Sequence, residues 1–96
     1  MNTEDSYKEK MSAQLKVWSA QIDVLEAKVE SANAELKVKR AEAIRDLRVK
    51  QNAASAKMAE LNSATGEAWT KVKETTDKVW DDLKTGLAAA HDKFKQ

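Results

Sequence analysis

The residues of this chain that could do chemistry are few: two adjacent carboxylates, Asp81 and Asp82, and a histidine beside a carboxylate, His91 and Asp92. Paired carboxylates can act as general acid and base when a pocket gives them different pKa values. Adjacent residues on a helix point in different directions, however, and a single histidine makes no metal site. We therefore predict no enzyme activity, no metal site and no cofactor, with these side chains in solvent.

A basic segment, Lys37 to Lys50, could attract nucleic acid through its phosphates. Its cations are spread around a helix, however, and they alternate with Glu42 and Asp46. The segment also contains no aromatic side chain on which a base could stack. We therefore do not expect this protein to bind nucleic acid.

The element that must carry these residues is a long amphipathic helix. Large apolar residues recur at intervals of eleven through more than half of the 96 residues: Leu25, Leu36, Leu47, Met58, Trp69 and Trp80. Eleven residues span about three helical turns, so one face of the helix stays apolar with little supercoiling. The chain has no proline and no cysteine, and 34% of its residues are charged. This composition and period predict an all-α protein of the coiled-coil type.

The N-terminal part has the clearest heptad pattern. Its apolar residues follow spacings of four and three: Met11, Leu15, Trp18, Ile22, Leu25, Val29 and Ala32. A seam of this kind should not stay in water, because each buried Leu, Ile or Val contributes about 1.5 to 3 kcal/mol. We expect it to mediate the formation of a homodimer or homotrimer.

The strongest helix break lies at residues 62–66, which combine capping side chains with the first glycine, Gly66. We predict a single domain with one helix over about 4–61, a turn over about 62–66 and a second helix over about 66–95. This antiparallel hairpin would set Asp77, Asp81 and Asp82 near Arg48 and Lys50. Two alternatives remain: one continuous helix of about 135 Å, and a three-helix bundle with another break at 31–33.

The helix interfaces should be formed by the residues of the apolar stripe. Arg40 lies at the centre of this stripe, where its guanidinium would either pair with a carboxylate across the interface or lie in an open part of it. The predicted interface residues are Leu15, Trp18, Ile22, Leu25, Val29, Leu36, Arg40, Leu47, Met58, Trp69, Val72, Trp80, Leu83 and Phe94.

Several stretches of this chain resemble a known class of proteins. They are Leu15 to Lys28 with its Leu25-Glu-Ala-Lys28 end, Gly66-Glu-Ala-Trp69, and Trp80-Asp-Asp-Leu83-Lys. Together they resemble small coiled-coil proteins of bacteria and cyanobacteria that are associated with stress tolerance. The eleven-residue repeats are also similar to those of desiccation-protective helical proteins and apolipoproteins. The resemblance implies an all-helical, cytoplasmic protein without enzyme activity.

These observations lead to two expectations about function. The first is a homo-oligomeric coiled-coil protein that interacts with other proteins and protects against stress. The alternative is a peripheral protein that lies on a lipid surface with Trp69, Trp80 and Phe94 in the interface. No segment has the roughly 18 apolar residues of a membrane span, and the N-terminus lacks the apolar segment of a signal peptide. We expect a cytoplasmic location.

Overall fold

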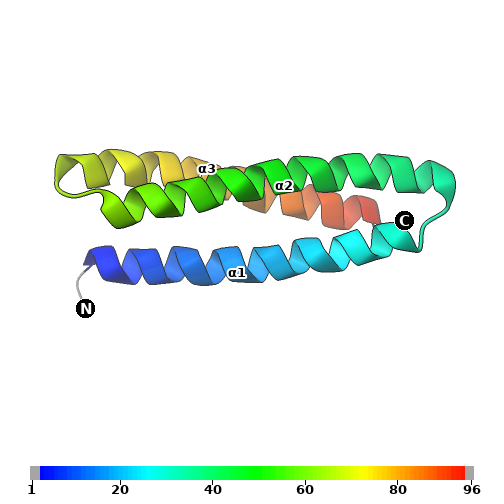
Figure 1. Ribbon diagram of the computed structural model, residues 1–96, viewed down its shortest axis with the longest axis horizontal. Coiled ribbons are helices and arrows are strands. Elements are labelled where there is room, and N and C mark those ends of the chain that lie inside the picture. The colour runs from blue at the N-terminus through cyan, green and yellow to red at the C-terminus, as the bar shows by residue number, and fades with distance from the viewer. Residues whose placement is uncertain (1–2, 95–96) are drawn as a thin grey trace.

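The computed structural model describes residues 3–94, and every regular element in this range is a helix. The helices are α1 (Thr3–Glu30), α2 (Ala34–Ser63) and α3 (Glu67–Phe94). Each helix runs antiparallel to the next along the chain, so α1 and α3 run in the same direction (Figure 1). The prediction of an all-α fold is confirmed. No helix of the described range is long and apolar enough to cross a membrane.

A break at residues 31–33 separates α1 from α2, so the prediction of one helix over residues 4–61 was wrong. Asn33 has extended backbone angles (φ −69°, ψ 167°), and its side-chain oxygen accepts a hydrogen bond from the Leu36 N–H at 3.0 Å. On the other side of the break, the Ser31 hydroxyl donates to the Lys28 carbonyl at 3.1 Å. Polar side chains therefore satisfy both helix ends without glycine or proline.

Folding back at this break buries the apolar seam of α1 within the same chain. Met11, Ile22, Leu25 and Val29 are all buried, and Ile22 has no exposed surface. The apolar seam of α1 therefore finds its partner within its own chain. The structure has three helices, as in the alternative with a second break, because burying the seam outweighs the loss of a few helical hydrogen bonds.

Asn33→Ala tests the importance of this cap. We expect the substitution to lower the free energy of unfolding by about 1 kcal/mol, because the Leu36 N–H loses its acceptor. The measurement is urea denaturation followed by circular dichroism. Asn52→Ala, at an exposed position inside α2, is the matched control and should be neutral or slightly stabilising. Equal effects of the two substitutions would contradict a capping role for Asn33.

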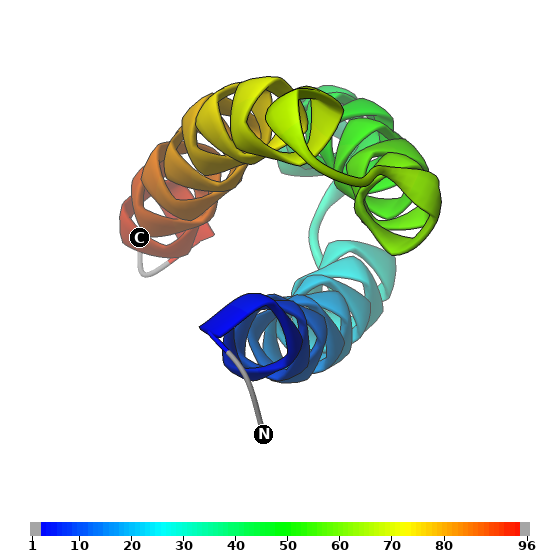
Figure 2. The same cartoon turned by 90° about the vertical axis from the view of Figure 1, so that its left-hand side faces the viewer.

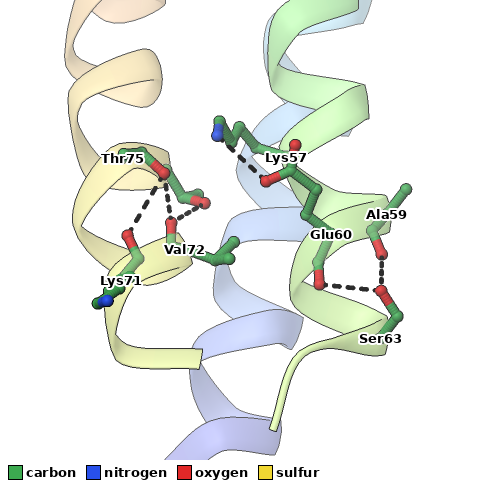
Figure 3. A network of polar contacts seen from close by, with 8 residues as sticks. Lys57, Ala59, Glu60, Ser63, Lys71, Val72 and Thr75 are labelled. Carbon is green, nitrogen blue, oxygen red and sulfur yellow. Dashed lines mark hydrogen bonds and ion pairs between the residues drawn. The ribbon is translucent and has the colours of Figure 1, made fainter. Parts of the chain in front are cut away.

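The second connection lies between Ser63 and Glu67 and overlaps the predicted turn at 62–66. Gly66 has a φ of 61°, a conformation that glycine adopts readily. The Ser63 hydroxyl donates to the carbonyls of Ala59 and Glu60 at the end of α2 (Figure 3). The predicted helix end at residue 95 lies outside the described residues.

The core lies along the inner faces of the three helices. Most members of the eleven-residue series are buried or half-buried there, whereas Leu36, in the first turn of α2, is 39% exposed. Gly86 allows α3 to approach α2 closely. A Cβ atom at this position would lie 3.0 Å from Lys50 Nζ and 3.3 Å from Leu47 Cδ2.

Candidate binding groove between α1 and α3

The three helices form an open arc, and the open side lies between α1 and α3 (Figure 2). Helix α2 packs against both of the other helices, whereas α1 and α3 contact each other much less. A closed three-helix bundle would bury all three helix pairs to a similar extent. The α1–α3 side is therefore where this fold can accept another molecule.

Large aromatic side chains bridge this gap from the N-terminal ends of α1 and α3 to the middle of these helices. The rings of Tyr7 and Trp69 meet edge to face with centroids 5.6 Å apart, and those of Trp18 and Trp80 lie 6.5 Å apart. The Tyr7 hydroxyl also donates a hydrogen bond to Asp77 Oδ1 at 2.5 Å. Aromatic residues can span a wide helix separation because they carry large areas of apolar surface.

The Tyr7 contact gives the protein a specific dependence on pH. Burial raises the pKa of Tyr7 above its ordinary value, and the hydrogen bond to Asp77 and the charge of Asp77 raise it further. Because the folded protein favours the neutral phenol, this stabilisation is complete below a pH of about 10 and is lost as the pH rises through the folded-state pKa.

Tyr7 is the only tyrosine, so its ionisation can be followed by ultraviolet absorption. We expect it to ionise at a higher pH in the folded protein than in urea. We also expect Tyr7→Phe to remove part of the loss of stability above pH 10. A titration midpoint that is the same in the folded protein and in urea would contradict the contact with Asp77.

The C-terminal halves of α1 and α3 enclose a groove of about 680 Å³. Its apolar surface comes from residues of both helices. The residues that line it are Val17, Trp18, Ala20, Gln21, Val24, Leu25, Lys28, Lys84, Leu87, Ala88 and His91. Ala20 and Ala88 are small, so this part of the gap lacks the bulk that the aromatic pairs supply nearer the N-termini.

The groove is lined by basic side chains from both helices. Lys28 comes from α1, and Lys84 and His91 come from α3. The lining includes no acidic side chain. The groove therefore combines an apolar surface with positive charge on both walls.

A second apolar stripe runs along α1, and three of its members also line the groove. Its members follow heptad spacing and are all exposed: Ala13, Val17, Ala20, Val24 and Ala27. Val17 is 55% exposed and Val24 is 57% exposed. We refer to these five residues as the outer stripe. Its spacing of four and three is visible in the sequence, but the stronger seam with Leu15 and Ile22 runs beside it.

Arg48 holds α1 against α2 on the side away from the groove. Its Nη2 donates to Asp23 Oδ1 at 2.8 Å and to Glu26 Oε2 at 2.5 Å. These hydrogen bonds raise the pKa of Arg48 above its ordinary value. The predicted placement of Arg48 near Asp77, Asp81 and Asp82 was therefore wrong, because folding back at 31–33 brings the acidic face of α1 to Arg48 first.

The predicted interface residues lie between the helices of one chain, with the exception of the largely exposed Leu36. Leu15, Trp18, Arg40, Met58 and Val72 are half-buried. The guanidinium carbon of Arg40 lies 5.1 Å from the centre of the Phe94 ring, which is a cation–π contact. The remaining members are buried: Ile22, Leu25, Val29, Leu47, Trp69, Trp80, Leu83 and Phe94.

The residues considered for catalysis do not come together. Asp81, Asp82 and Asp92 are exposed, and His91 lines the groove, whose charged side chains are the lysines Lys28 and Lys84. Within residues 3–94, no three histidine or carboxylate side chains are placed to hold a metal ion. Comparison with known proteins finds no matching family model, curated protein or solved structure.

Proposed function

We propose that this protein is a non-enzymatic helical interaction protein that forms a homodimer through the outer stripe of α1. The observation that supports this proposal is the exposure of Val17 and Val24 within a heptad-spaced row of alanines and valines. Small residues allow two helices to approach closely, and a row with this spacing presents one continuous apolar face. The partner is a second copy of the chain.

The order of residues in the outer stripe suits an antiparallel, two-fold symmetric pair. The stripe reads Ala, Val, Ala, Val, Ala, so reversing its direction leaves the pattern unchanged. A two-fold axis near Ala20 would pair the valines of one copy with those of the other, as an isologous interface requires. It would also place Lys16 of each copy near Asp23 of the other, where the opposite charges favour this orientation.

Val24→Glu tests the dimer. We expect the substitution to weaken self-association by at least about tenfold, because it places two carboxylates close together in an apolar contact. Sedimentation equilibrium measures the dissociation constant. Val49→Glu on α2, where the native valine is 63% exposed, is the matched control and should leave association unchanged. A wild-type protein that remains monomeric at about 1 mM would contradict the proposal, since such an affinity is negligible.

A second candidate function is binding to a lipid surface by an opened form of the bundle. Trp69 and Trp80 are 8% and 3% exposed, and neither indole N–H has a hydrogen-bond partner within the described residues. Each such N–H costs about 1–3 kcal/mol, and a membrane interface would supply acceptors for both. A shift in tryptophan fluorescence with anionic vesicles but not with neutral vesicles would support this function.

We further propose a cytoplasmic location and a role in stress protection. The absence of cysteine agrees with a reducing compartment. The stress-associated role comes only from the sequence resemblance. Loss of tolerance to heat or drying in cells that lack the protein would support it.

A further inference from the structure

The groove between α1 and α3 has the size of a small-molecule site. Its volume of about 680 Å³ lies within the range of about 300–1,000 Å³ that is typical of ligand pockets. Trp18, Leu25 and Leu87 supply the apolar surface of such a site. A second cavity, of about 370 Å³ between α1 and α2, differs because its lining includes the acidic Glu9 as well as Lys8 and Lys16.

The shape of the groove favours one extended apolar chain over a partner helix. From Val17 to Lys28 the groove follows α1 for about 16 Å, which is comparable with an extended dodecyl chain. At one end, the Trp18 and Trp80 rings already meet across the gap, with centroids 6.5 Å apart. A helix with its side chains is about 10 Å wide and could not pass between these rings.

The charges of the groove indicate which head group such a chain would carry. Lys28, Lys84 and His91 line the groove, and no carboxylate does. Lys28 and His91 stand in the last turns of their helices, where cations also stabilise the helix end. Lys84 lies almost three turns before the end of α3, so helix capping does not account for its position.

We propose that the groove binds one single-chain amphiphile with a carboxylate head group, such as a long-chain fatty acid. Its hydrocarbon chain lies against Trp18, Leu25 and Leu87, and its carboxylate lies at the Lys28 end of the groove, with Lys84 adding positive charge on the opposite wall. This site adjoins the proposed dimer contact, because Val17, Ala20 and Val24 belong both to the outer stripe and to the lining of the groove. The tests therefore alter Lys28 and residues of α3, and they leave the outer stripe intact.

The first experiment is calorimetric titration of the full chain with monomeric dodecanoate, with dodecyltrimethylammonium as the probe of opposite charge. We expect one dodecanoate to bind per chain and the cation to bind at least about tenfold more weakly. Lys28→Glu with Lys84→Glu should weaken dodecanoate binding by a similar factor. Lys39→Glu with Lys71→Glu, at exposed positions outside the groove, is the charge-matched control and should have no effect.

The second experiment fills the groove. Ala88→Trp should abolish dodecanoate binding, whereas Ala89→Trp, at the neighbouring exposed position outside the groove, should leave it unchanged. Circular dichroism will test whether both variants fold. Sedimentation equilibrium will measure dimer formation independently of dodecanoate binding.

The proposal is overturned if the two probes bind equally, if Ala88→Trp and Ala89→Trp behave alike, or if dodecanoate does not bind. Binding to anionic vesicles without binding of monomeric dodecanoate would also overturn it and would favour a membrane surface instead. If the wild-type protein binds dodecanoate but does not form a dimer, only the proposed self-association is refuted.

Discussion

We expect a short distance between spin labels attached at Ser19→Cys and Gln51→Cys. The two labels stand on packed helices, whose axes lie about 8–10 Å apart. In the structure, Gln51 Nε2 donates to Ser19 Oγ at 2.6 Å, so α1 and α2 are in contact at this point. A continuous helix through residues 31–33 would instead separate the two positions by about 48 Å. The chain has no native cysteine, so only the introduced residues will carry labels.

The measurement is pulsed electron spin resonance with labelled protein diluted into unlabelled protein, which removes distances between chains. A pair of labels at Ala41→Cys and Asn52→Cys, both within α2, is the control. Its separation of about 16 Å is the same whether or not the chain breaks at 31–33. A long distance for the first pair with the expected distance for the control would refute the folding back of α1.

Ile22→Ala will produce the second large effect, a loss of about 2–5 kcal/mol in the free energy of unfolding. Ile22 has no exposed surface, and removing three of its carbon atoms leaves a cavity as well as losing apolar burial. Val24→Ala is the matched control, because this valine is also aliphatic and β-branched but is 57% exposed. We expect the control to change the stability of the monomer by no more than about 0.5 kcal/mol.

Chemical denaturation at several protein concentrations separates two explanations of this effect. If Ile22 is buried within one chain, its substitution costs the same free energy at every concentration. If the seam of α1 were instead buried between chains, the apparent loss would change with concentration, because association and folding would be coupled. A loss below about 1 kcal/mol would contradict the burial of Ile22 in the core.

The sequence by itself determined the helical fold and the inward face of most of the chain. Apolar residues at helical spacing, such as Leu47 and Trp80, are buried because periodicity is a local property that each helix expresses on its own. The turn near Gly66 was likewise visible, because glycine and capping residues act on neighbouring backbone groups.

The break at residues 31–33 could not be predicted with the same certainty. Asn33 can cap a helix but can also lie within one, and its choice depends on whether the inner face of α1 finds a surface to cover. That surface is provided by α2 and α3, through contacts between residues far apart in the sequence. The partners of Arg48 followed from the same choice, since Asp23 and Glu26 reach it only after α1 folds back.

Only the tertiary structure decided where the surface of the protein has a groove. The sequence shows Val17, Val24, Lys28 and Lys84, but it does not show that the first three, on α1, line one groove together with Lys84 on α3. The groove exists because α1 and α3 both pack on α2 while aromatic rings lie between them, and small side chains such as Ala20 and Ala88 stand farther along. Such a gap depends on the relative volumes of side chains from two helices, which no local pattern records.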